Sequence, residues 1–173
     1  NGQMYSIIVV KDQEIRKQLV AMNPGNPHVL HSSVFLEFVA DLKRTQKVAE
    51  HYGVDYRINE GFDPVITAVT DAALALENAV IATEALGLGS VVVGTIRKDI
   101  AEVSELLKLP DYVLPVAGLS IGKPIVDMRV KPRLPEEAVI HYDTYTDYDY
   151  SVIEEYDDAM EKFAEARETK LWS

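Results

Sequence analysis

Apolar positions along the 173-residue chain fall into short β-branched runs and into stretches with helical spacing. A run of four to eight apolar residues predicts a strand, and apolar residues three or four apart predict a helix with one buried face. Four runs predict strands, at residues 5–10, 34–39, 90–96 and 112–122. The combination of these runs with helical patterns predicts an α+β fold.

Two short helices are predicted between these strands. The first follows residues 5–10 and is capped by Asp12, and the second begins at Asp99 and ends before Pro110. Their inward faces are formed by Ile15, Leu19 and Met22 in the first helix and by Val103, Leu106 and Leu107 in the second. The charged stretch after residue 39 has too weak a pattern, through Gly61, to predict any element.

The longest helical pattern covers residues 64–86. Asp63 is predicted as its N-cap, Pro64 occupies the first helical position, and Gly87 lies just beyond its end. The segment is rich in Ala, Val, Leu and Ile on nearly every side. A helix that is apolar all round is a buried one, so we expect a central helix, covered by the sheet on one side and by other helices or a partner subunit on another.

The composition changes after Pro124. The segment "KPRLP" (131–135) predicts an extended loop, "EEAVIHY" (136–142) predicts a fifth strand, and residues 143–151 are rich in tyrosine and aspartate. Cation binding by this acidic segment is less favoured than a solvated linker or a subunit contact. Ser151 is predicted to cap a charged helix that runs to about residue 167, whose apolar stripe is Ile153, Tyr156, Met160 and Phe163.

Composition limits the classes of protein to consider. With 47% hydrophobic residues, the length suits one domain, residues 1–173. The 28 acidic and 17 basic residues give a net charge of -11, which argues against binding to nucleic acid or to anionic membranes. The absence of cysteine excludes thiolate and disulfide chemistry and suits a cytoplasmic protein. Because the chain starts at Asn1 and enters a strand almost at once, we expect it to be truncated at both ends.

The chain offers little for side-chain catalysis. It has no cysteine and no G-x-S-x-G motif, and its four histidines lie in unrelated contexts, so neither a nucleophilic enzyme nor a metal site is expected. The glycines of "EALGLGSVVVGTIRKD" do not form the G-x-G-x-x-G fingerprint of a dinucleotide loop. Their spacing differs, and a helix precedes them where the fingerprint needs a strand.

A few polar groups are suited to holding a ligand. Gln3 is an amide placed just before a strand, where it can read the edge of a heteroaromatic ring. Gly94 and Thr95 are predicted to interrupt a buried strand, where a missing side chain lets a flat group approach the backbone. Lys131 and Arg133 flank a proline and form a candidate phosphate clamp. Taken singly, each has a structural alternative: a surface amide, a β-bulge and solvated loop charges.

Together these segments resemble a known family. The stretch "ATEALGLGSVVVGTIRKDIAEVSELLKLPDYVLPVAGLSIGKP", followed by "VKPRLP", is similar to the nitroreductase superfamily of FMN-dependent NAD(P)H oxidoreductases. The similarity is greatest to the group of oxygen-insensitive NADPH nitroreductases and NAD(P)H-flavin reductases. The resemblance implies a mixed sheet around a buried central helix, extended arms for dimerisation, and a homodimer with FMN at the subunit interface.

The resemblance also implies a set of cofactor-binding residues. They are Gln3, Met4 and Tyr5 at the isoalloxazine ring, Val92, Val93, Gly94 and Thr95 along the flavin, and Lys131 and Arg133 near the FMN phosphate and ribityl chain. Arg167 and Lys170 are weaker candidates for the 2′-phosphate of NADPH, with ordinary surface charge as the alternative. Val-Val-Gly-Thr stands where many relatives carry Tyr-Ile-Gly-Gly, and the N-terminal segment with the family's other phosphate ligands is not in this sequence.

The implied reaction is carried by the cofactor, so no catalytic side chain is expected. NADPH or NADH gives a hydride to flavin N5, and free flavin, a nitroaromatic or a quinone then takes the electrons. Two alternatives remain open: a member of the fold that fragments or dehydrogenates its own ligand, and a flavin-binding or structural module without turnover. The physiological acceptor and the preference between NADH and NADPH are left undecided.

Overall fold

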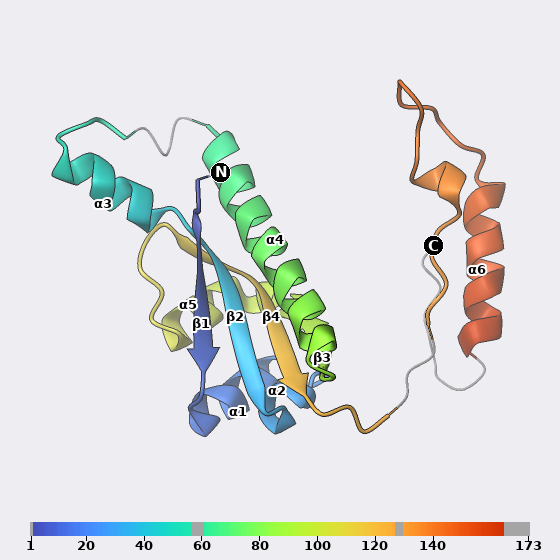
Figure 1. Cartoon of the computed structure of the whole chain (residues 1–173), viewed down its shortest axis with the longest axis horizontal. Coiled ribbons are helices and arrows are strands. Elements are labelled where there is room, and N and C mark those ends of the chain that lie inside the picture. Colours follow the sequence, from blue (N-terminus) through green and yellow to red (C-terminus); the bar gives the residue numbers. More distant parts are fainter. Residues whose placement is uncertain (1, 57–60, 127–129, 165–173) are drawn as a thin grey trace. The chain divides into compact units, whose positions relative to one another are not determined.

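A four-stranded antiparallel sheet forms the centre of the N-terminal part of the chain (Figure 1). Its strands are β1 (Tyr5–Val10), β2 (Val34–Asp41), β3 (Gly89–Val93) and β4 (Val113–Gly122), in the order β1-β2-β4-β3. The four predicted strands and the α+β class are therefore confirmed. Every pair among the described strands is antiparallel, however, so this sheet is not mixed. A buried apolar run does not reveal the direction of its neighbour.

The computed structural model describes residues 2–56, 61–126 and 130–164. The chain divides into two compact units, Asn1–Ile125 and Val126–Ser173, which are described separately below.

Two layers of helices cover opposite faces of the sheet in the first unit. Alternate side chains of β2 point to opposite faces. Phe35 packs in a cluster with residues of α1 (Gln13–Met22), α2 (His28–His31) and α5 (Ile100–Leu106). Phe38 packs on the other face with Leu76 of α4 (Asp63–Ala85). The alternation along β2 therefore sets the architecture of this unit.

Helix α1 confirms its prediction in detail. It begins after Asp12, whose Oδ1 accepts hydrogen bonds from the backbone N–H of Glu14 and Ile15. Its Leu19 is completely buried.

Helix α4 meets the sheet along one side. Its buried residues, Ala68, Ala72, Leu76 and Thr83, form one stripe that faces the sheet. The described residues of the first unit leave the rest of its apolar surface uncovered, and Leu74 is 65% exposed. The expected cover by the sheet is confirmed, and the expected cover of the other side, by other helices or a partner subunit, stays a prediction.

The ends of α4 and its composition complete this description. Phe62, not Asp63, is the N-cap, and Asp63 is the first helical residue, so the predicted cap is off by one position. Gly87 has φ +70, as the predicted helix end requires. By length and composition α4 is apolar enough to cross a membrane, with a mean hydropathy of 1.6, a property that core helices of soluble proteins share. Of the 18-residue window with this hydropathy, 22% is buried, and the buried residues of α4 lie on the stripe that meets the sheet.

Strand β3 is shorter and less buried than predicted. It ends at Val93, and Gly94–Asp99 forms a 3-10 helix, η1, that leads into α5. Gly94 and Thr95 thus follow the strand and do not interrupt it. Val92 is 50% exposed, because β3 is an outer strand of the sheet.

Two helices were not predicted from the sequence. α3 (Lys43–His51) has no buried residue, so it lacks the apolar stripe on which a prediction depends. α2 is a single turn, which is too short to show a helical period.

The second unit contains a short 3-10 helix, η2 (Glu136–Ala138), and α6 (Ser151–Ala164). The predicted strand at residues 136–142 is wrong: the backbone N–H groups of Val139 and Ile140 bond to Glu136 O instead of to a neighbouring strand. The predicted stripe of α6 is confirmed, with Ile153 and Met160 buried.

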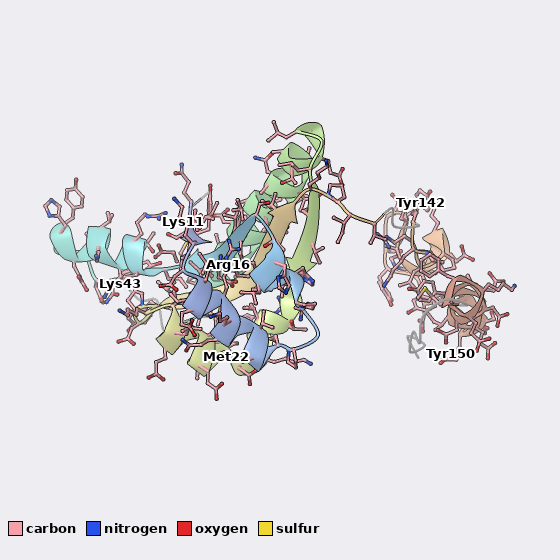
Figure 2. The ribbon with its side chains drawn as sticks, turned by 90° about the horizontal axis from the view of Figure 1, so that it is seen from below. Lys11, Arg16, Met22, Lys43, Tyr142 and Tyr150 are labelled. Carbon is pink, nitrogen blue, oxygen red and sulfur yellow. The ribbon has the colours of Figure 1, made fainter. Side chains whose placement is uncertain are left out.

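The start of α6 is capped differently from the prediction. Ser151 is already helical, and its N–H donates to Asp149 Oδ1 at 3.0 Å. Hydrogen bonds from Ser151 lower the pKa of Asp149, so Asp149 takes the capping role assigned to Ser151. Figure 2 shows Tyr150 at this helix and Tyr142 in the preceding loop.

Candidate functional site

Gln3 has an unusual backbone conformation. Its φ is 48, in the left-handed region that costs a side-chain-bearing residue free energy. The Arg44 guanidinium holds it there, because Nη1 donates to Gln3 O at 2.7 Å and to Tyr5 O at 3.1 Å. The Gln3 side chain is left exposed. A strained residue held by a distant side chain is typical of functional sites.

Met4 anchors the same segment on the sheet. It is buried with Ala40, Leu42 and Ala68, and its N–H donates to Asp71 Oδ2 on α4 at 3.0 Å. This segment is therefore fixed from both β2 and α4, and only Gln3 and part of Tyr5 are available to a ligand.

The second predicted group lies at the end of β3. Val93 is buried, whereas Val92 is half exposed and Gly94 and Thr95 are partly exposed. Thr95 Oγ1 accepts a hydrogen bond from Asn26 Nδ2 at 2.9 Å, which fixes the first turn of η1. A Cβ added to Gly94 would lie 3.3 Å from an Arg97 Nη2 atom, so the space above Gly94 is bounded by that guanidinium.

The sheet does not bring Gln3 and Gly94 together within one chain. Gln3 lies just before β1 and Gly94 lies just after β3. These are the two outer strands of the sheet, and β2 and β4 lie between them. Three strand spacings correspond to about 14 Å. The two groups are thus separate candidate contact points in the first unit.

The predicted basic pair belongs to the second unit. Lys131 and Arg133 are exposed, and among the described residues neither forms a salt bridge. Arg133 lines a cavity of about 620 Å³ together with Val139, Ile140 and Tyr156. Both cations are therefore free to bind an anion. Arg167 and Lys170 lie outside the described residues, so their role stays a prediction.

A buried carboxyl group in β2 escaped the sequence analysis. Glu37 is completely buried, and neither carboxyl oxygen has a hydrogen-bond partner in the described part of the chain. Burial raises its pKa to about 8, and the charge of Arg97 offsets part of this rise. The signal was present as one acidic residue within the apolar run "VFLEFV".

Arg16 was also missed, and it has a structural role. Its guanidinium is buried and donates from Nε to Val10 O and from Nη1 to Ser32 O, both at 2.8 Å (Figure 2). Burial lowers its pKa. It ties the end of β1 to the end of α2.

The histidines offer no metal site in the part of the chain that is described. Burial lowers the pKa of His28, which favours its neutral form. No group of three or more His, Cys, Asp or Glu side chains is placed to hold a metal ion among those residues.

Comparison with known proteins gives a consistent result. The model of the "Nitroreductase family" matches residues 3–123, and that of the "Nitroreductase family, C-terminal domain" matches residues 131–173. The boundary between the two matches lies close to the division between the two structural units.

Curated relatives cover nearly all of this chain. It is 39% identical to "FMN reductase [NAD(P)H]" of Bacillus subtilis over 100% of its length and 72% of the relative's. It is 37% identical to the "Oxygen-insensitive NADPH nitroreductase" of Salmonella typhimurium over 93% of its length and 65% of the relative's. It is 41% identical to a second Bacillus subtilis protein, "FMN reductase (NADPH)", over 83% of its length and 58% of the relative's. The chain thus spans between 58% and 72% of these relatives.

Solved structures share the fold. NfrA2 of B. megaterium superposes with a TM-score of 0.89 at 38% identity, covering 99% of this chain and 72% of that one. An NADPH:FMN oxidoreductase of Vibrio harveyi, complexed with NAD+, gives 0.83 at 30% identity, covering 93% and 68%.

Proposed function

Because the chain belongs to the nitroreductase family, we propose that it is an FMN-dependent oxidoreductase that passes electrons from NAD(P)H to free flavin, nitroaromatic or quinone acceptors. The observation that carries this proposal is the 39% identity to an FMN reductase over the whole chain. The chain spans between 58% and 72% of the length of these relatives, so the activity of the whole protein is part of the proposal.

The residues of the first unit fit a flavin. The backbone of Gln3 is held at φ 48 by Arg44, and its exposed side-chain amide offers a donor and an acceptor to a ligand. At the end of β3, Gly94 has no side chain to block a flat ring from the backbone N–H groups, and Val92 offers an exposed apolar surface. These properties suit an isoalloxazine ring, which has hydrogen-bonding edges and apolar faces.

Lys131 and Arg133 of the second unit are the proposed ligands of the FMN phosphate. Both are exposed cations without a salt bridge among the described residues, and an arginine matches a phosphate with two parallel N–H donors. We therefore propose that residues 1–173 act as one FMN-binding domain.

When bound, FMN supplies hydride and electron transfer at its N5 atom. The protein then has to bind, orient and leave room for two substrates in turn, and it needs no general base. This agrees with the sequence, which has no cysteine and no G-x-S-x-G motif.

A homodimer is part of the proposal. Helix α4 exposes apolar residues on the side away from the sheet: Ile66, Leu74 and Ile81. Such a surface is unusual on a monomer and suits a second copy of the chain. A dimer also explains how Gln3 and Gly94, which lie apart within one chain, can each contribute to an FMN site at a subunit interface. We place the protein in the cytoplasm, in keeping with the absence of cysteine.

The experiment that tests this function is a reductive titration. The protein is expressed with any flanking segments, reconstituted with FMN, and mixed anaerobically with NADPH or NADH while the flavin absorbance is followed. Bleaching, followed by recovery on addition of FMN, a nitroaromatic or a quinone, is the expected result. Flavin that binds but stays oxidised with both nicotinamides indicates a flavin-binding module without turnover. Failure to retain FMN overturns the assignment.

A further inference from the structure

A basic cavity in the first unit is lined by none of the residues assigned to FMN above, although Arg44, which lines it, also donates hydrogen bonds to Gln3 O and Tyr5 O. It has a volume of about 400 Å³ and is bounded by β1, β2, the start of α3 and the turn that follows α5. Four cationic side chains line it, namely Lys43, Arg44, Lys47 and Lys108. Figure 2 shows Lys43 on α3.

The charge of this cavity is opposite to that of the protein. The chain carries a net charge of -11, yet among the residues that the structure describes Asp41 is the only acidic one that lines the cavity. Asp41 Oδ2 already accepts hydrogen bonds from Ser6 Oγ at 2.6 Å and from Arg44 Nη2 at 3.4 Å. Asp41 is therefore engaged, and it leaves the lysines without a counter-charge.

The lysines are available to a ligand. Lys47 and Lys108 are exposed, and no carboxylate in the described part of the chain lies within salt-bridge distance of either. Lys43 is half-buried and is oriented by a hydrogen bond from Nζ to Gln46 Oε1 at 3.1 Å. Unpaired cations that converge on one cavity favour a ligand with several negative charges, because each added charge interacts with all of them.

The wall below the cations is apolar. It is formed by Ile8, Val39, Leu109, Pro110 and Val113. An inorganic anion gains nothing from such a wall, whereas an organic group buries apolar surface against it. The combination of a charged rim and an apolar wall therefore points to an organic phosphate.

We propose that this cavity binds a nucleotide through its phosphate groups, which contact Lys47 and Lys108, while its base or ribose lies against the apolar wall. The site is distinct from the FMN residues and does not depend on flavin chemistry. The inference thus goes beyond the proposed function, and nucleotide binding at this cavity is tested separately from the flavin-dependent activity.

The test is a binding titration of the FMN-reconstituted full chain with 5′-ADP, orthophosphate and adenosine. Calorimetry gives the affinities, and backbone amide shifts in the NMR spectrum locate the ligand. We expect 5′-ADP to bind more tightly than either of the other two, to shift the amides of residues 43–47 and 107–109, and to bind more weakly as the NaCl concentration rises. If FMN is not retained, the same titration is carried out on the flavin-free chain.

The decisive variant is Lys47→Gln with Lys108→Gln, since neither side chain makes a described hydrogen bond or ion pair whose loss would disturb the fold. It should lower the affinity for 5′-ADP by about tenfold or more. Its matched control is Lys11→Gln with Lys123→Gln, which removes the same charge from exposed positions of the same unit outside the cavity and should leave the affinity unchanged. Equal weakening by both pairs, amide shifts confined to other residues, or orthophosphate binding as tightly as 5′-ADP would overturn the proposal.

Discussion

Replacing Glu37 with glutamine is expected to stabilise the protein increasingly as the pH rises. The folded-state pKa of Glu37 is about 8, against 4.5 for the free side chain. Between these values the folded chain binds a proton that the unfolded chain has released, so the free energy of unfolding falls as the pH increases. Glutamine has nearly the same shape and does not titrate, so the variant lacks this loss.

The size of the effect follows from the two pKa values. Each pKa unit of difference corresponds to about 1.4 kcal/mol, so the full shift costs the wild type about 5 kcal/mol above pH 8. By pH 6 about 2 kcal/mol of this is already lost. The difference between the variant and the wild type should therefore grow by about 3 kcal/mol from about pH 6 to pH 9.

Urea denaturation followed by circular dichroism measures this difference at each pH. Glu105→Gln is the control, since Glu105 is exposed on α5 and the same substitution there should give nearly parallel stability curves. Parallel curves for Glu37→Gln and the wild type would show that the Glu37 carboxyl is not buried and unpaired as the structure describes. A variant that loses stability at every pH would show that the carboxyl makes hydrogen bonds that an amide cannot replace.

Four further predictions test the proposed flavin site and the dimer. Gln3→Gly should weaken FMN binding and raise the free energy of unfolding by about 1 kcal/mol, because glycine adopts the left-handed conformation without strain. Gln3→Ala should weaken FMN binding without raising the free energy of unfolding. Equal stability of the two variants would show that the backbone at this position is not strained. Lys131→Ala combined with Arg133→Ala should lower FMN affinity about tenfold in a fluorescence titration, and unchanged affinity would remove the pair from the site. Gly94→Ala should fold normally by thermal unfolding, since only the flexible end of an arginine side chain has to move, yet bind FMN less tightly; normal binding would show that the ring does not approach this backbone. Leu74→Glu should shift the protein from dimer to monomer in analytical ultracentrifugation, because it places a charge on the exposed apolar side of α4, and an unchanged dimer would place the interface elsewhere.

Elements with a buried face were predictable from the sequence, and elements without one were not. The strands and α1 have apolar positions at the period of their secondary structure, and each was recovered with small errors at its ends. α3 buries no residue, so no apolar pattern marks it. The segment at residues 136–142 is apolar in part, but local hydrogen bonds to Glu136 O satisfy its backbone, and propensity alone does not reveal that competition.

The candidate site was predictable as a set of segments but not as a geometry. Gln3 and Gly94 were singled out by their residue types and by resemblance to a family, and the structure places both on accessible surface. The left-handed backbone of Gln3 depends on Arg44, which is 41 positions away, and no local pattern around Gln3 contains that information. The buried carboxyl of Glu37 likewise depends on Gly118 in the neighbouring strand, where a Cβ would come within 3.2 Å of Oε2.

Helix α4 shows what a pattern can and cannot say about its environment. An apolar surface all round predicts that every side is covered, but it does not say whether the cover comes from the same chain. In this chain the stripe from Ala68 to Thr83 meets the sheet, and Leu74 and Ile81 on the other side are more than half exposed. The amphipathic α6 has no such surplus, because its polar residues occupy the side away from its stripe. The exposed apolar surface of α4 is therefore not needed for one chain to fold. Association with a second copy would bury it.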